Sequence, residues 1–391
     1  MSTWVILGCG YIGTRLVRAL LADGEPVLAC GRNKEHIAEL ERAGADAYFF
    51  DAARSRAFTY AMSSLRSPIA VYLLPPLPGF PGGEIVSRAT AAALASGANR
   101  FIYLSSTAVY GEGRDGETVD EESQIALSDP DARPYLSAEG AIENARANGL
   151  DAVILRLSPV YGPNRGVRER LLGGTYRILD QGQHVYSRIH VDDVVGIIRA
   201  VVARAPVNAT YCLADDRPCP QKEYAEWLSE HLETKPPTSV PSLAPGMPRR
   251  RVRNRAVSNA RLKRELEYAF RYPTYREGEL AIDRELGVEG KAVEQPPLVI
   301  HKLGEPDKPA QKTGFRRLTV MRTELSPGSE ERISSAGETM LYLASGELVA
   351  SHGEKTHSVT AGDLVEVPRL GLHVKAASEA PASLLIISSP R

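Results

Sequence analysis

Short apolar runs alternate with helical patterns along the first half of the chain. Between the first two runs, Ile12, Leu16, Ala19 and Leu20 recur at the spacing of one helical face, and Gly24 follows as a helix stop. The apolar runs have the length of buried strands and cover residues 4–7, 27–30, 47–50, 69–74, 101–104 and 153–157. This alternation is typical of βαβ units, so we predict an α/β fold with a Rossmann-type, doubly wound parallel sheet.

The pattern changes towards the end of the chain, and 391 residues are long for one core. Residues 222–232 and 259–266 have helical patterns, and we assign residues 205–286 to a small substrate lobe of a first domain, 1–286. Residues 287–312 carry prolines and mixed charges, as linkers do. Strand-like runs separated by turn signals follow at 317–325, 339–343, 347–351, 364–367, 372–376 and 383–387. Their even spacing predicts a small all-β barrel or jelly roll over 313–391.

A glycine motif lies between the first strand and the first helix. Residues 8–13 read GCGYIG, a GxGxxG pattern in the context that a dinucleotide site requires. Its glycines permit a tight turn, close approach of a pyrophosphate and close packing of helix on strand, while the helix N-terminus faces the anion. We predict that the cofactor contacts Gly8, Gly10, Tyr11, Ile12 and Gly13.

The end of the second strand bears on the choice of coenzyme. Residues 30–34 read CGRNK, where an NAD site would offer an acid to the ribose 2′-hydroxyl. A guanidinium can pair with a 2′-phosphate, so Arg32, with Asn33 beside it, favours NADP over NAD. The alternative is that Arg32 is a solvated residue at the start of a helix. Asp51, after the third strand, either meets the adenine edge or caps the next helix.

Charge and hydropathy exclude several classes of partner. Lys and Arg number 47 and Asp and Glu 48, so the net charge of −1 provides no field that attracts nucleic acid. The chain enters a strand at once without the pattern of a signal peptide, and no stretch approaches the roughly 18 to 20 apolar residues of a membrane span. The four cysteines lack metal-site spacing. We expect a cytoplasmic protein with no membrane contact.

Through about residue 286 the chain resembles the short-chain dehydrogenase/reductase superfamily, specifically its extended and atypical members of the NAD-dependent epimerase/dehydratase type. The matching segments are 8–13, 101–111 (FIYLSSTAVYG), Tyr135, 155–163 (LRLSPVYGP), 188–193 (RIHVDD) and 251–278. The resemblance implies that Ser106, with Thr107 beside it, hydrogen-bonds a substrate oxygen and that Tyr135 is the general acid/base. It also implies that the nicotinamide half of the cofactor is lined by Leu74, Pro75, Pro159 and Tyr161.

One residue of the family pattern YxxxK is missing. Glu139 stands where the lysine belongs, and there is no lysine between Lys34 and Lys222. The lysine lowers the tyrosine pKa, whereas a neighbouring carboxylate raises it. Tyr135 then serves only as a protonated donor, as carbonyl reduction allows, or the domain binds its cofactor without rapid turnover. The remaining alternative is that Tyr135 is a surface tyrosine in a loop.

Charged residues near position 190 have two interpretations. Asp192 and Asp193, with His190, precede a helical pattern over 194–202, so the two acids are read as caps of that helix. Arg188 is expected either on the cleft side, where it would bind an anionic group of the substrate, or in a surface salt bridge.

Residues 313–388 resemble a cupin in the segments 327–328, 338–346, 361–368 and 371–373. Metal-binding cupins supply three histidines and a glutamate, of which only Glu338 and His373 remain here. Two ligands are too few for a tight transition-metal site, so we expect no metal. His352 and His357 are assigned to a solvated turn. The barrel would bind a ligand, support the first domain or pair two copies into a homodimer.

These features leave more than one function open. The first hypothesis is an NADP-dependent oxidoreductase or epimerase-like enzyme that acts on a small polar substrate, either a carbonyl compound or a sugar-like molecule. The second is a cofactor-binding sensor or assembly protein with little turnover. A third is that the barrel itself binds or isomerises a sugar-like ligand.

Overall fold

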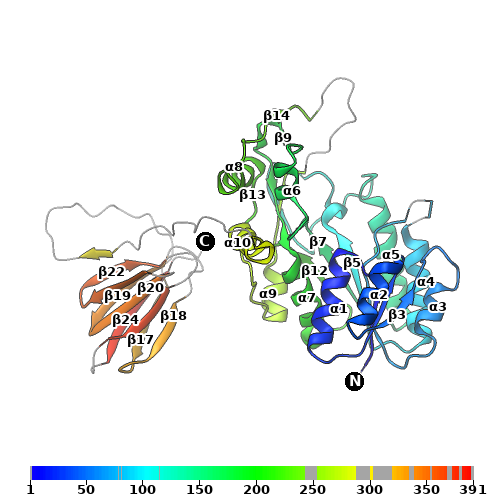
Figure 1. Cartoon of the computed structure of the whole chain (residues 1–391), viewed down its shortest axis with the longest axis horizontal. Coiled ribbons are helices and arrows are strands. Elements are labelled where there is room, and N and C mark those ends of the chain that lie inside the picture. The colour runs from blue at the N-terminus through cyan, green and yellow to red at the C-terminus, as the bar shows by residue number, and fades with distance from the viewer. Residues whose placement is uncertain are drawn as a thin grey trace. The chain divides into compact units, whose positions relative to one another are not determined.

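The computed structural model contains two compact units, Met1–Lys291 and Ala292–Arg391 (Figure 1). It describes residues 2–77, 79–80, 82–113, 115–242, 253–287, 300–302, 319–333, 339–352, 355–367, 372–377 and 381–388. The division falls inside the segment 287–312, most of which lies outside the described residues. Each unit is described by itself.

A seven-stranded parallel sheet forms the centre of the first unit, in the order β12-β7-β5-β4-β1-β2-β3. Its strands are β1 (Trp4–Leu7), β2 (Val27–Gly31), β3 (Asp46–Phe49), β4 (Ile69–Tyr72), β5 (Arg100–Ser106), β7 (Ala152–Leu157) and β12 (Thr210–Leu213). The six predicted strands and the doubly wound parallel sheet are confirmed. The seventh, β12, was not predicted, because its four residues follow the charged end of a long helix and do not stand out as an apolar run. It belongs to the sheet and not to the substrate lobe.

Helices cover both faces of this sheet. One face carries α1 (Tyr11–Ala22), α2 (Lys34–Arg42), α7 (Val191–Arg204) and α9 (Ala260–Leu266), and the other carries α3 (Ala57–Met62), α4 (Gly82–Ala95) and α5 (Arg133–Ala147). Side chains of one strand alternate between the faces, since Ile6 packs into the first core while Val5 and Leu7 pack into the second. Because both faces are buried, each strand reads as a continuous apolar run, which is why the sequence revealed them.

The substrate lobe is built from short elements with a core of their own. Residues before α7 contribute β8 (Val160–Tyr161), α6 (Val167–Leu172), β9 (Ile178–Leu179), β10 (Val185–Tyr186) and β11 (Ile189–His190). Later residues contribute β13 (Cys219–Pro220), α8 (Gln221–His231), β14 (Ser239–Val240) and α10 (Tyr275–Leu286). In addition, β15 (Arg255–Val257) pairs with β6 (Glu117–Val119). The lobe therefore draws on two parts of the chain and not on 205–286 alone.

A buried ionic cluster ties the two parts of the lobe together. Arg168 of α6 is 2% exposed, and its guanidinium donates to Glu279 at 3.1 Å and to Asp283, both on α10. His231 at the end of α8 contacts the other oxygen of Asp283 at 2.5 Å. Removing one partner of such a cluster would leave a buried charge uncompensated, so the cluster fixes α6 and α8 against α10.

The start of α7 differs from the expected one. The helix begins at Val191, and the cap is His190, whose Nδ1 accepts the backbone N–H of Asp192 at 3.2 Å. Burial lowers the pKa of His190 to about 3, so the ring stays neutral and can accept this bond. Asp192 pairs with Arg15 on α1 at 3.1 Å, and Asp193 accepts the backbone N–H groups of residues 271 and 272. The two acids lie in the first turn and do not cap the helix.

The second unit consists of two antiparallel sheets, ordered β16-β22-β19-β24-β17 and β18-β23-β20-β21. The first contains β16 (Ile300–Lys302), β17 (Thr319–Leu325), β19 (Thr339–Ser345), β22 (Asp363–Glu366) and β24 (Ala382–Ser388), and the second contains β18 (Glu330–Ile333), β20 (Glu347–His352), β21 (Lys355–Thr360) and β23 (Leu372–Ala376). Aliphatic side chains from both sheets, such as Leu343 and Leu348, share one core.

Of the strands that the described residues of this unit form, six were predicted and three were not. β16 lies in the predicted linker, β18 follows a turn, and β21 occupies the place of the expected turn, so His352 and His357 lie on paired strands. The cupin-like barrel itself remains a prediction. Among the described residues no three His, Cys, Asp or Glu side chains are grouped so that they could hold a metal ion. Glu338 lies outside the described residues, while His373 is exposed on β23.

No helix in the described part of the chain is both long and apolar enough to cross a membrane.

Candidate functional site

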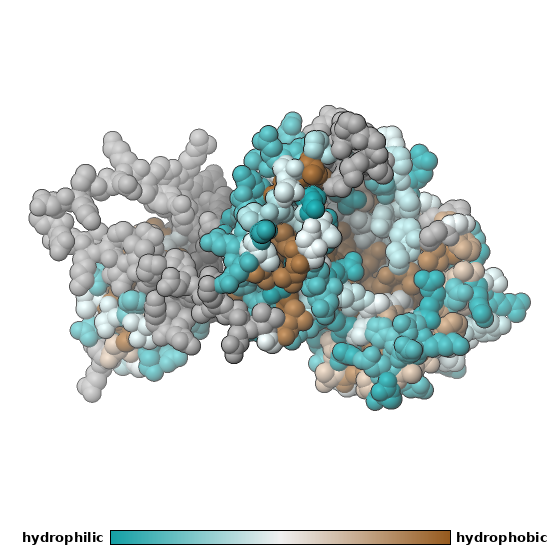
Figure 2. All heavy atoms as spheres, turned by 45° about the horizontal axis from the view of Figure 1, so that its top comes forward, coloured by the Kyte–Doolittle hydropathy of each residue, from teal (hydrophilic) through white to brown (hydrophobic). Residues whose placement is uncertain are grey.

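The candidate site lies at the carboxyl ends of the parallel strands, where the strand order reverses between β1 and β4. Open α/β sheets bind their ligands at such a switch point. The loops that follow β1 and β4 touch there, because a Cβ added to Gly8 would lie 3.0 Å from Leu74 Cδ2. Figure 2 brings the upper side of Figure 1 forward and shows hydrophobic side chains exposed in a recess of the first unit.

The glycines of the first loop have different surroundings. Gly8 has a φ of +116°, which glycine tolerates best, and a Cβ on Gly13 would lie only 2.3 Å from the carbonyl oxygen of Gly8. A Cβ on Gly10 would meet nothing within 4 Å. Gly13 therefore serves helix packing, whereas Gly10 leaves open space in front of α1. No side chain caps α1, so its first N–H groups are available to an anion such as a pyrophosphate.

The side chains of Tyr11 and Ile12, next to these glycines, contact other parts of the protein. The hydroxyl of Tyr11 donates to the carbonyl oxygen of Pro163 at 2.9 Å, and Arg165 lies over its ring at 5.1 Å. Burial raises the pKa of Tyr11 to about 12, so the hydroxyl keeps its proton. Ile12 packs against the core under α1. Both residues could therefore contact a cofactor mainly through their backbone.

The three polar residues predicted around the adenosine have distinct surroundings. Arg32 is exposed and, among the described residues, takes part in no hydrogen bond or ion pair. Asn33 caps α2, since its Oδ1 accepts the backbone N–H groups of residues 35 and 36. Asp51 accepts the N–H of Ala53 at 3.1 Å and does not cap α3, which begins six residues later. Only the side chain of Arg32 is thus entirely free to bind a phosphate.

Ser106 ends β5 with a half-buried side chain. Its Oγ accepts the N–H of Ala108 at 3.1 Å, which leaves its proton free to donate. The neighbouring Thr107 is buried and donates to the carbonyl oxygen of Leu157 at 3.4 Å. Of the two hydroxyls predicted to polarise a substrate, that of Ser106 is the accessible one.

Tyr135 lies in the first turn of α5, half-buried, and not in a surface loop. Its ring packs against the buried cluster that contains Val109 and Tyr110, which follow Ser106 by three and four residues. Helix α5 also packs against β5 and against the short helix η1 (Thr107–Tyr110). The structure thus brings the helix that carries Tyr135 alongside the strand end that carries Ser106.

The side chain of Glu139, which stands at the position of the missing lysine, is buried in the core. Glu139 is 7% exposed, and its Oε2 accepts from Arg156 Nη2 at 2.9 Å. Its Oε1 accepts from Ser105 Oγ at 2.6 Å. The guanidinium of Arg156 therefore balances the charge of Glu139.

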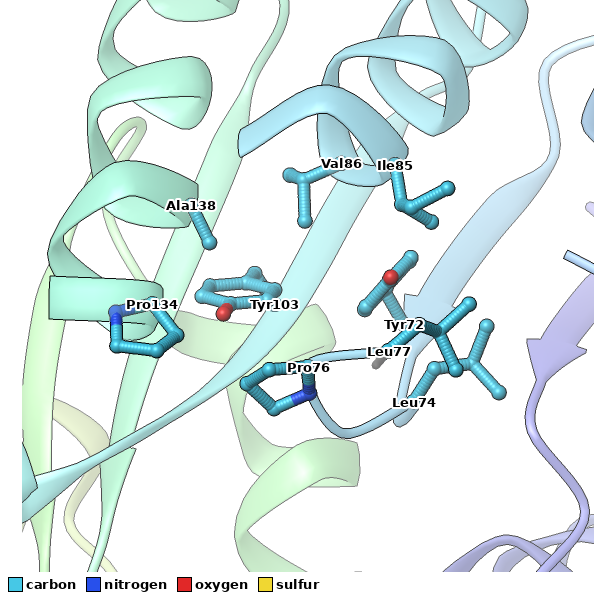
Figure 3. Close-up of a pocket in the computed structure, with 9 residues that line it drawn as sticks. All are labelled: Tyr72, Leu74, Pro76, Leu77, Ile85, Val86, Tyr103, Pro134 and Ala138. Atoms are coloured by element: carbon cyan, nitrogen blue, oxygen red, sulfur yellow. The ribbon is translucent and has the colours of Figure 1, made fainter. Parts of the chain in front are cut away.

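A pocket opens between the loop after β4 and the first turn of α5 (Figure 3). It is lined by Tyr72, Leu74, Pro76, Leu77, Ile85, Val86, Tyr103, Pro134 and Ala138. None of these side chains carries a charge at neutral pH, since burial raises the pKa of both tyrosines. Of the predicted nicotinamide contacts, Leu74 lines this pocket and Pro159 is exposed. The side chain of Tyr161 instead lies inside the lobe against Gly278, with its hydroxyl donating to the carbonyl oxygen of Thr274 at 3.4 Å.

The environment of Arg188 differs from both expectations. The residue is 6% exposed, and its guanidinium lies 4.1 Å from the centre of the Tyr224 ring and donates to the sulfur of Cys219 at 3.0 Å. Tyr275 covers it from a second direction. Burial raises the pKa of nearby Asp215 well above its ordinary value, although Arg188 opposes that shift. Arg188 is consequently a core residue of the lobe, neither in a surface salt bridge nor open to the cleft.

Arg255 was not predicted and holds the loop after Ser106 in place. It is buried on β15 and donates to the carbonyl oxygens of Thr107, at 2.6 Å, and Gly111. The loop between these two oxygens follows Ser106 directly. In the sequence Arg255 lies at the end of a basic run, which looks like a solvated surface and gives no sign of burial.

Comparisons with known proteins agree with this geometry. The chain is 28% identical over 308 residues to a 3-diazoavenalumate denitrifying reductase of a Streptomyces species, a match that covers 71% of this chain and 99% of the relative. A protein of unknown function from Silicibacter pomeroyi has a solved structure with 28% identity and a TM-score of 0.63, covering 73% of this chain and 99% of that one.

Similarity of fold extends to more distant structures. The UDP-glucose 4-epimerase of Thermotoga maritima, solved with UDP-glucose, has a TM-score of 0.63 at 21% identity and covers 73% of this chain and 99% of its own. Residues 4–214, more than half of the chain, match the NAD dependent epimerase/dehydratase family. The chain therefore belongs to the NAD-dependent epimerase/dehydratase family.

Proposed function

We propose that the first unit is an NADPH-dependent reductase of a carbonyl group on a small polar substrate. The observation that carries the proposal is an accessible Ser106 hydroxyl beside the helix that carries Tyr135, with no lysine to ionise the tyrosine. A bound nicotinamide would supply the hydride. Ser106 donates a hydrogen bond to the substrate oxygen, and Tyr135 gives its proton to the same oxygen as the carbonyl becomes a hydroxyl. The phenolate of Tyr135 then takes a proton back from water.

The missing lysine bears on whether this site would oxidise or reduce its substrate. Epimerases and dehydratases that begin by oxidising a substrate hydroxyl must first remove its proton, which requires an ionised tyrosine. Glu139 cannot replace the lysine as a positive charge, and both of its oxygens are already bonded. Reduction needs only a proton donor, so these residues favour reduction over epimerisation. The reductase name of the Streptomyces relative supports the same class.

The residues around the first loop fit a dinucleotide. Gly10 leaves room for a pyrophosphate in front of the uncapped N-terminus of α1. Burial raises the pKa of the adjacent Cys9 to about 12, so no thiolate would repel the phosphates. The free guanidinium of Arg32 would take the 2′-phosphate.

The direct test is consumption of NADPH by the full-length protein in the presence of a panel of small ketones, aldehydes and keto sugars. Turnover on at least one member, with faster rates for NADPH than for NADH, is the expected result. Micromolar NADPH binding without turnover on any compound would contradict the reductase. That outcome would favour a cofactor sensor whose second unit relays occupancy of the site.

Arg32→Ala is expected to weaken NADPH binding by about 10- to 100-fold, because one charge-assisted contact to a phosphate contributes about 1.5 to 3 kcal/mol. NADH lacks the 2′-phosphate, so its dissociation constant should change by less than about threefold. Isothermal titration calorimetry with both coenzymes measures the difference. Arg42→Ala removes an exposed guanidinium from the other end of α2 and serves as the control. Equal losses for NADPH and NADH would refute the phosphate assignment.

A further inference from the structure

We propose that Glu139 is a positioning residue that fastens α5 to the end of β5 and so sets the separation of Tyr135 and Ser106. This inference rests on the proposed function. Glu139 follows Tyr135 by four residues, which is about one helical turn, so the two side chains lie along one side of α5. Whatever fixes Glu139 therefore fixes the first turn, and with it the phenol.

The connection to the strand runs through Ser105. Its Oγ donates to Glu139 Oε1 at 2.6 Å, and its side chain is buried. The hydroxyl of Ser105 therefore faces α5, one residue before Ser106 at the end of β5. One hydrogen bond thus joins the helix that carries the proton donor to the residue beside the one that would polarise the substrate.

Arg156 holds the carboxylate from the next strand. It pairs with Ser105 in the register of β5 and β7, and it donates through Nε and Nη2 to the two oxygens of Glu139 at 3.2 and 2.9 Å. Its third contact, from Nη1, reaches the hydroxyl of Tyr110 at 2.9 Å. Burial alone would lower the pKa of Arg156, but Glu139 and Tyr110 raise it, so the guanidinium stays charged. The pair therefore locks α5, β5, β7 and η1 into one arrangement.

Glu139 occupies the position of the family lysine but does not carry out the chemistry of that lysine. A lysine at position 139 would reach towards the cofactor, whereas Glu139 is turned into the core and its oxygens are bonded to Ser105 and Arg156. Its contribution to catalysis is the geometry that it imposes on Tyr135. Loss of that geometry should lower turnover without changing coenzyme affinity, because positioning errors act on the chemical step.

Ser105→Ala tests this inference, since it cuts the link to β5 and leaves the Glu139–Arg156 ion pair in place. We expect kcat to fall about tenfold, with the NADPH dissociation constant within about twofold and an unchanged shape of the pH profile. Ser229→Ala is the matched control. It removes an equally buried serine hydroxyl, which donates to the carbonyl oxygen of Ala225 at 2.7 Å within α8. Equal kcat values for Ser105→Ala and Ser229→Ala would overturn the positioning role.

A second measurement separates this inference from the reductase proposal. In protein labelled with 13C-tyrosine, the NMR signal of Tyr135 is assigned by its absence in Tyr135→Phe. Ser105→Ala should shift or broaden that signal, and Ser229→Ala should leave it in place, whether or not any substrate is turned over. An unchanged Tyr135 signal in Ser105→Ala would refute the positioning role. A shifted signal in a protein that fails the reductase screen would refute only the proposed reaction.

Discussion

Tyr135→Phe should lower kcat by about 100- to 1,000-fold while NADPH affinity stays within about twofold. General acid catalysis by a positioned side chain contributes about 10²- to 10⁴-fold, and the phenol is the proton donor that the site offers to the substrate oxygen. The lower part of that range applies here, because the hydroxyl of Ser106 would still polarise the carbonyl. Steady-state kinetics with the best substrate of the panel, together with calorimetry for NADPH, measures both quantities.

Tyr60→Phe is the control for this prediction. Tyr60 is 59% exposed on α3, and its substitution removes a hydroxyl from the surface without touching the site. A kcat for Tyr135→Phe within about threefold of the wild type would show that another group supplies the proton. In the double variant Tyr135→Phe/Ser106→Ala, the further loss of kcat should be smaller than the loss that Ser106→Ala causes alone. Both residues act on one oxygen, so their contributions are coupled.

Six of the central strands of the first unit and its glycine motif could be predicted from the sequence alone. Strands buried on both faces must be apolar throughout, so runs such as Trp4–Leu7 stand out from their surroundings. The glycine motif is equally local, because Gly8 and Gly13 meet within a single turn. Elements that depend on partners elsewhere were harder to find. The short strand β12 and the strand β21 became recognisable only with the strands that pair with them.

Burial of charged residues could not be predicted, because their partners lie far away in the sequence. Arg156 and Glu139 are 17 residues apart, and Arg255 meets the Thr107 carbonyl across 148 residues. Arg156 lies within a predicted strand, but the sequence gives no sign of its partner, whereas Glu139 and Arg255 look like surface residues and are core residues in the fold. The same holds for Arg188, which aromatic rings from α8 and α10 cover. Glu139 shows the consequence for function, since its sequence position suggested a defect in the active site and its contacts reveal a structural pair.

Two glycine variants should separate the packing role of the first loop from its binding role. In Gly13→Ala the new Cβ would lie 2.3 Å from the carbonyl oxygen of Gly8, and backbone atoms cannot yield to it without moving α1 away from β1. Overpacking of this kind costs about 1 to 3 kcal/mol of folding free energy. Because the displaced helix also carries the N–H groups that would face the pyrophosphate, NADPH affinity should fall by about 100-fold or more.

Gly10→Ala should behave differently. Its Cβ meets no atom within 4 Å and its φ of −94° is negative, although its ψ of −149° lies outside the usual β range, so the thermal midpoint should fall less than in Gly13→Ala. The added methyl group would nevertheless occupy the space in which a pyrophosphate approaches the backbone, and NADPH affinity should fall by about 10-fold or more. Thermal unfolding without ligand and calorimetry with NADPH measure the two effects. Wild-type affinity in Gly10→Ala would mean that no pyrophosphate lies against this loop, and the proposed cofactor site would have to be abandoned.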